Sequence, residues 1–178
     1  MFKICSNPRR WLCALLACLT LFMCGLCGCS NKESGITGNE WLVKQKVLLE
    51  DLSAFTEGMD EVYSLYLVGG ISESDFLTEL RLLKQQYAIL NQFYVQLKNE
   101  NPVKEGTHSY VSKRGSDAIA NYYSILGEIF DNSVDGKGSP LKADQLAYVY
   151  MAYQQQLTSA LAEYTTAIIW LEEGQTAQ

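Results

Sequence analysis

The sequence predicts an all-α protein, an antiparallel up-down four-helix bundle over residues 39–174. Three observations support this fold class. Apolar residues recur every three or four positions in four long segments, which is the period of helices that pack knobs into holes. Short stretches rich in glycine, proline, asparagine and aspartate separate these segments, and short loops join antiparallel neighbours. No segment shows the two-residue alternation of a half-buried strand.

The composition fits a folded domain and excludes one class of function. The chain has 178 residues, of which 48% are hydrophobic and 19% charged, enough apolar material for one domain with a core. Three of its 14 basic residues (Lys3, Arg9 and Arg10) and none of its 20 acidic residues lie in the first 28 positions, so residues 29–178 carry a net charge of −9. Contacts with phosphates need a basic face, and we therefore expect no nucleic-acid binding.

The first 28 residues are built like a secretory signal segment. A basic start is followed by an uncharged apolar stretch over 11–28, and polar residues follow from Ser30. An uncleaved transmembrane helix is the alternative, because about 18 apolar residues are just long enough to span a membrane. A metal cluster at Cys24, Cys27 and Cys29 is a third interpretation, but the apolar surroundings would leave the ligands without polar supporting partners.

The end of this segment resembles the lipobox of bacterial lipoproteins. Leu26 matches the branched apolar position, Cys27 and Gly28 match the two small positions, and Cys29 matches the obligatory cysteine. The resemblance implies cleavage after Gly28 and acyl chains, palmitate among them, on Cys29. Two or three acyl chains anchor a protein stably in a membrane. It therefore implies a lipid-anchored protein on the extracytoplasmic face of a bacterial membrane, with the other cysteines removed in the signal peptide.

Beyond the lipobox, the chain divides into a tether and a bundle. Residues 29–38 form a short polar tether, and the expected helices lie at about 38–68, 73–100, 108–133 and 140–173. Local signals set the ends of these helices. Gly69 ends the first helix, the spacing of Ser72 and Asp75 matches a capping box at the second, and Pro102 ends the second. Pro140 is expected at the first position of the fourth helix, where proline is favoured.

The periodic apolar residues are the predicted core. In order along the four segments they are Leu48, Leu52, Phe55, Met59, Val62, Tyr66; Phe76, Leu80, Leu83, Tyr87, Leu90, Tyr94, Leu97; Val111, Gly115, Ala118, Tyr122, Ile125, Ile129; and Leu146, Tyr150, Tyr153, Leu157, Ala160, Tyr164, Ala167, Leu171. Several of these positions are tyrosines and several are small. Interdigitation of large and small residues and a groove for a polar ligand between the helices both remain open.

The sequence offers little for catalysis. His108 is the single histidine, and a lipidated Cys29 would leave no free thiol to pair with it. The Gly-x-Ser-x-Gly motif of a nucleophile elbow does not occur. A di-iron centre in a helical bundle needs two Glu-x-x-His motifs, and a chain with a single histidine cannot supply two. We therefore expect that the protein is not an enzyme.

The segment between the third and fourth predicted helices is the strongest candidate for a metal site. Asp131, Ser133, Asp135 and Ser139 stand at positions 1, 3, 5 and 9 of a stretch with glycine at position 6, so the segment resembles the start of an EF-hand calcium loop. Position 12, which needs a bidentate glutamate, is Lys142. A plain helix–helix turn uses the same residue types. Calcium is the one cofactor that the sequence suggests, and both interpretations remain open.

A few large apolar residues fit the core series poorly. On the predicted register Tyr148 and Ile169 point outward, and Met151 and Trp170 do not fall on the core positions. Trp41, Ile169 and Trp170 would lie together at the membrane-proximal end. They form either a surface patch for a partner or the bilayer interface, or a cluster that caps the core.

Two functions are therefore expected from the sequence. The first is a non-enzymatic interaction module that binds another envelope or secreted protein, which a filled core and an apolar outer stripe on the fourth helix would favour. The alternative is a lipoprotein that binds a small molecule or calcium, which an internal cavity or calcium-dependent stability would favour.

Overall fold

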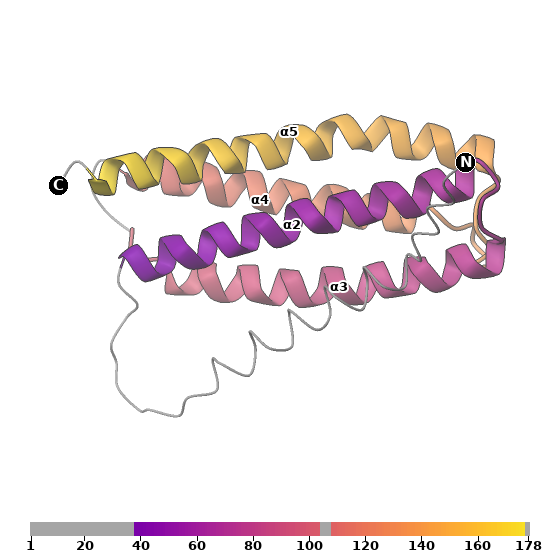
Figure 1. Cartoon of the computed structure of the whole chain (residues 1–178), viewed down its shortest axis with the longest axis horizontal. Helices are drawn as coiled ribbons and strands as arrows, with labels where there is room; N and C mark the ends of the chain where they lie inside the picture. Colours follow the sequence, from indigo (N-terminus) through magenta and orange to yellow (C-terminus); the bar gives the residue numbers. More distant parts are fainter. Residues whose placement is uncertain (1–37, 104–107, 177–178) are drawn as a thin grey trace, which may run out of the picture. The chain divides into compact units, whose positions relative to one another are not determined.

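Four long helices make up most of the chain that the computed structural model describes, residues 38–103 and 108–176 (Figure 1). The helices are α2 (Gly38–Leu67), α3 (Glu73–Glu100), α4 (Ser109–Asp131) and α5 (Ala143–Thr176). Within these described ranges the β-pairing consists of one isolated bridge, and there is no strand. The all-α prediction is thus confirmed.

Each helix runs antiparallel to the one that precedes it, and the four close into a ring (Figure 1). α2 packs on α3, α3 on α4, α4 on α5, and α5 returns to α2. This is the predicted up-down bundle. One end of the bundle holds the start of α2, the end of α3, the start of α4 and the end of α5.

The predicted signals act at the start of α3 and the end of α2. The Ser72 side chain accepts a hydrogen bond from the Asp75 backbone N–H at 3.1 Å, which caps α3. Gly69 follows α2 with a φ of +71°, a left-handed conformation that glycine adopts without strain, and its N–H donates to the carbonyl of Tyr66. α3 ends at Glu100, because Asn101 precedes Pro102 and is disfavoured in the helical region.

The predicted start of the fourth helix was wrong. α5 begins at Ala143 and not at Pro140, because Pro140 forms an antiparallel bridge with Val134 instead. The backbone N–H of Leu141 donates to the carbonyl of Ser133 at 3.0 Å, and the Tyr66 hydroxyl donates to the carbonyl of Leu141 at 3.0 Å. These two contacts keep the chain non-helical for two residues beyond Pro140.

The core follows the predicted series closely. All of the predicted positions are buried except Tyr87, Val111 and Tyr153, which are half-buried. The core also contains large residues outside the series, because a helix inside a bundle buries a wider stripe than a two-position seam. These additional residues are Trp41, Leu42, Tyr63, Ile119, Tyr123, Leu126, Phe130 and Ile168.

Residue size sets how closely the helices approach. α4 and α5 pack tightly where both carry small residues, and a Cβ added to Gly115 would lie 3.1 Å from the Cβ of Ala167. Aromatic rings fill the space between α3 and α4. The ring of Tyr123 lies 5.6 Å from that of Tyr87 and 5.4 Å from that of Tyr94, centroid to centroid. Small residues thus face each other between α4 and α5, and large rings face each other between α3 and α4; the Tyr164 ring, 3.8 Å from a Cβ added to Gly115, is a contact of the large-on-small kind that the sequence suggested.

The predicted signal segment, and with it the lipobox residues Leu26, Cys27, Gly28 and Cys29, lies outside the described residues. In the part of the chain that is described, no helix is both long enough and apolar enough to cross a membrane.

Candidate functional site

The outer face of α5 carries an exposed stripe without charge. We call this set the outer stripe, and its seven exposed members recur every three or four residues: Tyr148, Met151, Gln155, Ser159, Ala162, Thr166 and Ile169. The charged residues of α5 are Asp144, Glu163, Glu172 and Glu173; Asp144 and Glu173 lie in line with the stripe, one turn before Tyr148 and one turn after Ile169, and so mark the ends of its uncharged length. From Gln145 to Ala162 the helix has no charged residue at all.

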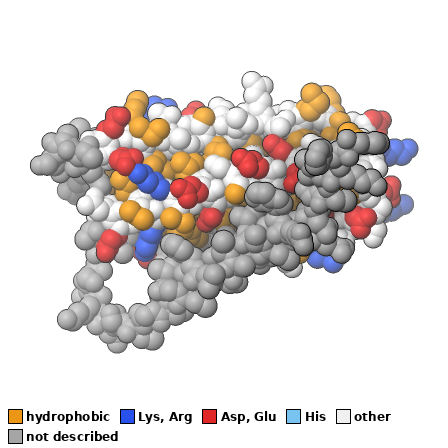
Figure 2. Space-filling model, viewed as in Figure 1, with side chains coloured by type: hydrophobic (Ala, Val, Ile, Leu, Met, Phe, Trp, Pro, Cys, Tyr) orange, Lys and Arg blue, Asp and Glu red, His pale blue; other side chains and the backbone are white. Residues whose placement is uncertain are grey.

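Large apolar side chains lie at both ends of the outer stripe. Tyr148 is 79% exposed and Met151 70%, while Ile169 is 48% and the neighbouring Trp170 50% exposed. Figure 2 shows orange side chains towards both ends of the edge that α5 forms in Figure 1, with mainly uncharged white side chains between them. The prediction that Tyr148 and Ile169 point outward is confirmed.

The geometry of a helix explains why these side chains remain exposed. Residues two positions apart are separated by about 200° around an α-helix. Leu146 and Tyr150 are buried against the other helices, so Tyr148, midway between them, must face away from the bundle. α5 therefore has an apolar side that is buried against the other helices. The opposite side is uncharged and remains exposed.

The other three helices present charges on their outer faces. Exposed charged residues are found on each of them: Glu50 and Glu57 on α2, Arg81 and Lys84 on α3, and Lys113 and Asp117 on α4. An outer helix face normally carries such residues because charged groups remain solvated there. α3 also has a run of exposed uncharged residues (Gln85, Ala88, Gln92, Val95 and Asn99), but the outer stripe of α5 is longer and carries more large apolar side chains.

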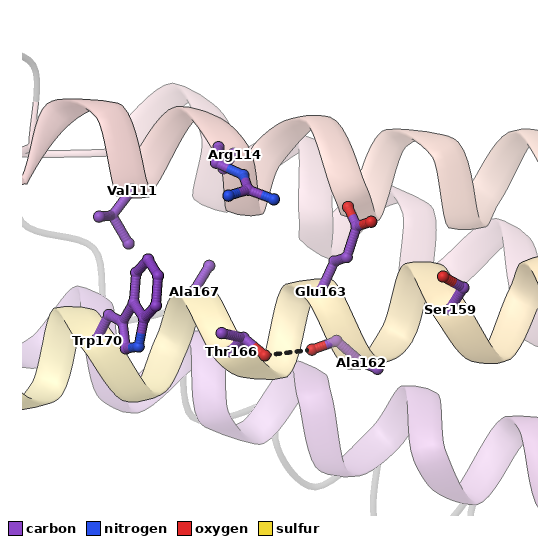
Figure 3. A pocket seen from close by; sticks show the side chains of 8 residues that line it. All are labelled: Val111, Arg114, Ser159, Ala162, Glu163, Thr166, Ala167 and Trp170. Carbon is purple, nitrogen blue, oxygen red and sulfur yellow. Dashed lines mark hydrogen bonds between the residues drawn. The ribbon is translucent and has the colours of Figure 1, made fainter.

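A groove of about 250 Å³ lies beside the outer stripe, between α4 and α5 (Figure 3). Its lining combines small, apolar and charged residues: Val111, Arg114, Ser159, Ala162, Glu163, Thr166, Ala167 and Trp170. In Figure 3 the Arg114 side chain extends from α4 and the Glu163 carboxylate from α5 into the space between these helices, and the Trp170 ring faces Val111. The groove thus offers one positive group, one negative group and an indole ring.

Trp41 does not belong to this surface. Its side chain is 3% exposed, and its indole Nε1 donates a hydrogen bond to the carbonyl of Leu97 at 2.9 Å. A tryptophan can be buried when its N–H finds a partner, and the free end of α3 supplies one. Of the two alternatives for the tryptophan cluster, Trp41 follows the core alternative, and Ile169 and Trp170 follow the surface alternative.

The four predicted calcium ligands at the loop between α4 and α5 differ in burial. Ser133 is buried, whereas Asp131, Asp135 and Ser139 are exposed. The hydroxyl of Ser133 is 0% exposed and is bonded to the Tyr63 hydroxyl at 2.7 Å and the Ile129 carbonyl at 2.5 Å. One carboxylate oxygen of Asp135 accepts the backbone N–H groups of Lys137 and Ser139, at 2.8 and 3.0 Å.

Asp131 is exposed at the end of α4, and the Ser139 side chain is exposed in the loop. Over residues 38–103 and 108–176, no three histidine, cysteine, aspartate or glutamate side chains are grouped so as to hold a metal ion. Calcium binding by this loop stays a prediction, although the Ser133 oxygen faces the core.

The buried tyrosines fill the bundle interior. The hydroxyl of Tyr122 bonds with that of Thr56 at 2.7 Å, and the hydroxyl of Tyr164 donates to the side chain of Gln45. Burial raises the pKa of both phenols far above the usual value, so both stay neutral. The interior space beside Trp41, Gln45 and Tyr164 measures about 10 Å³, room for at most one water. The core around the predicted tyrosine position Tyr164 is therefore closely packed.

His108 lies where the start of α4 meets the end of α5. A Cβ added to Gly174 would lie 2.1 Å from its Cε1 atom, so the imidazole packs directly on the α5 backbone. This contact places the single histidine in a structural position between two helix ends.

Comparison with known proteins finds no matching family model, no matching curated protein and no matching solved structure. The outer stripe and the adjoining groove are consequently identified from residues and geometry alone. Sequence reasoning singled out the large residues of the stripe but missed its continuity. The signal in the sequence that could have revealed this continuity is the absence of charged residues from Gln145 to Ala162.

Proposed function

We propose that this protein is a lipid-anchored module of the bacterial cell envelope that binds another protein through the outer stripe of α5 and is not an enzyme. The observation that carries the proposal is the exposed, charge-free stripe with Tyr148, Met151 and Trp170 at or beside its ends. Protein interfaces are depleted of charged residues at their centre and enriched in tyrosine, tryptophan and methionine. The interior space beside Trp41, Gln45 and Tyr164, about 10 Å³, is too small for a ligand and favours a scaffold at that place.

The proposed anchor is the lipidated Cys29, which the lipobox resemblance implies. From there the tether of residues 29–38 reaches at most roughly 30 Å when fully extended. The bundle would therefore stay close to the membrane, and the end that holds Trp170 would face it. A partner of the outer stripe must then be another protein of the envelope, or a secreted protein that reaches it.

Site-specific photo-cross-linking in the anchored chain tests the docking surface. A photoreactive residue at Ala162, in the middle of the outer stripe, should give discrete protein adducts in intact cells. Photoreactive residues at Ala120, exposed on α4, and at Ala88, exposed on α3, are the matched controls. They should give no adducts. An absence of adducts at Ala162, or equal adducts at all three positions, would contradict the proposal.

The anchor has a separate test. Cys29→Ala should abolish incorporation of labelled fatty acid and cleavage after Gly28, whereas Cys27→Ala keeps a small residue before the cleavage site and should leave both unchanged. If Cys29→Ala is still acylated and processed, the lipobox assignment is wrong. This result would leave the docking surface on α5 unaffected, because that surface lies in the folded bundle.

Binding of a small molecule in the groove is the second candidate function. It is favoured by the opposed charges of Arg114 and Glu163 beside the Trp170 ring, which match a small zwitterion such as a free amino acid. The volume of about 250 Å³ is just below the usual range for ligand sites. Thermal-shift measurements with free amino acids should then show stabilisation that Arg114→Ala and Glu163→Ala each remove. No stabilisation by any of them would exclude this candidate.

A further inference from the structure

We infer that the partner on the outer stripe is a second copy of this chain, anchored beside the first in the same membrane with the two α5 helices parallel. The inference rests on the proposed function, because the lipid anchor is what gives neighbouring copies the same orientation. Two equally oriented copies can be related by a two-fold axis that runs along the bundle. Such an axis makes a self-complementary interface, in which the same face of each copy takes part.

The symmetry decides which face of the bundle can take part. With parallel helices, every residue on the contact line meets its own counterpart at the same height. A charged residue there would face an identical charge, which is destabilising at close range. Glu50 on α2, Arg81 on α3 and Lys113 on α4 would each meet such a like charge. The outer stripe of α5 avoids this along its length from Tyr148 to Ile169, and the charged residues in line with it, Asp144 and Glu173, lie one turn beyond its two ends.

The same argument distinguishes a second copy from an unrelated partner. A different protein can place a basic group opposite each acid, so its docking face has no need to be free of charge. Residues 29–178 carry a net charge of −9, which makes two copies repel each other in general. A stripe free of charge on an otherwise acidic protein is therefore the property that self-association requires.

The spacing and sizes of the stripe residues fit two parallel helices. Their steps of three and four residues average 3.5, the period at which two α-helices keep the same faces together. Ser159 and Ala162 near the middle are small and permit close approach, while Tyr148, Met151 and Ile169 supply apolar area at the ends. From Tyr148 to Ile169 the contact line would extend about 30 Å.

Polar members such as Gln155 and Thr166 limit the strength of this contact. The membrane anchor compensates for this weakness, because confinement to one membrane raises the effective concentration of one copy around another. The pairing is thus expected to be strong in the membrane and weak for a chain released from it.

Disulfide cross-linking of the full chain in its membrane tests the inference. Ala162→Cys places a thiol on the contact line, opposite its own counterpart. Mild oxidation should convert most of the mature chain to a species of twice its mass. Ala120→Cys and Ala88→Cys, on the exposed faces of α4 and α3, are the matched controls and should stay monomeric. The unsubstituted chain controls for the native cysteines.

A like-charge substitution provides the second variant. In a chain that also carries Met151→Cys, Ala162→Glu should reduce the cross-linked fraction at least tenfold, because two carboxylates would face each other. Ala120→Glu should leave it unchanged. Ala162 is exposed, so the melting temperature of the variant should match that of the parent chain, which separates lost pairing from lost folding.

The outcomes separate the inference from the proposed function. Same-residue cross-links at Ala162→Cys with none at the controls support the inference. Mixed cross-links between Tyr148→Cys and Ile169→Cys chains, without same-residue products, indicate antiparallel copies and overturn it. Photo-adducts at Ala162 that contain only a different protein also overturn it but leave the proposed function standing. If Ala162 gives no adduct of any kind, both fail.

Discussion

At the scale of single residues, the buried tyrosine hydroxyls divide into two classes. Those of Tyr63, Tyr122 and Tyr164 make hydrogen bonds. Those of Tyr123 and Tyr150 are buried without a partner among the described residues. A hydroxyl that is buried and unbonded costs free energy, whereas a bonded one contributes to stability. The same substitution should therefore have opposite effects at the two kinds of position.

Tyr150→Phe should leave the free energy of unfolding unchanged or raise it by up to about 1 kcal/mol, because the ring that stacks on Tyr63 at 4.4 Å is kept and the unbonded hydroxyl is removed. Tyr122→Phe should lower it by about 1 kcal/mol, because the bond to Thr56 is lost. Urea unfolding of both variants measures the difference. Equal losses in the two proteins would show that the Tyr150 hydroxyl is bonded after all.

A second residue-scale effect concerns the carboxyl of Asp51 on α2. Burial raises its pKa above the usual value, and the neighbouring charge of Glu50 raises it further. A raised pKa means that the folded state favours the protonated form. The stability that this group contributes is therefore present below its unfolded pKa of about 3.9 and is lost as the pH rises through the folded pKa.

Asp51→Asn should accordingly raise the melting temperature at pH 7, where it removes a charge that burial penalises, and should give a smaller gain near pH 3.5, where the wild-type carboxyl is largely protonated. Melting curves at the two pH values measure this. Asp117→Asn, at an exposed position on α4, is the control and should show little change at pH 7. A gain from Asp51→Asn that is equally large at both pH values would rule out titration of this carboxyl as its cause.

At the scale of elements, the period of the apolar residues located all four helices, because burial in a bundle is set by the helical repeat. What the period cannot show is a local contact that competes with helix formation. Pro140 was expected inside the fourth helix, but the bridge to Val134 and the hydroxyl of Tyr66 hold that stretch outside it. Trp41 was ambiguous for a similar reason, since its partner is a backbone carbonyl 56 residues away, that of Leu97.

The α4–α5 loop allows a prediction that separates its two interpretations. Asp135→Ala should lower the free energy of unfolding by about 1 kcal/mol, because the carboxylate bonds to the N–H groups of Lys137 and Ser139 are lost. As a turn residue, Asp135 should have this effect with or without calcium. The melting temperature of the unsubstituted chain, measured in EDTA and in millimolar calcium, provides the comparison. A rise with calcium that Asp131→Ala and Asp135→Ala both abolish would establish the EF-hand interpretation instead.

At the scale of the whole molecule, an acidic bundle with a long uncharged stripe on its last helix follows from the distribution of charge along the sequence. The predicted register already placed Tyr148 and Ile169 outward, and the fold was needed to show that Met151 and Ala162 share their face. The run without charge is visible in the sequence, but on its own it fits a fully buried helix equally well. The packing of α5 against α2 and α4 establishes which side remains open.

The net charge of −9 on residues 29–178 predicts how salt should act on pairing through this face. Two acidic copies repel each other at long range, and salt screens this repulsion, with a Debye length of about 30 Å at 0.01 M and about 8 Å at 0.15 M. Raising the salt concentration between these values should therefore increase the same-residue cross-linking of the Ala162→Cys chain in isolated membranes. Docking of a basic partner on the acidic bundle should respond in the opposite direction, because salt would screen an attraction. Cross-linking that falls as salt rises would favour such a partner over a second copy.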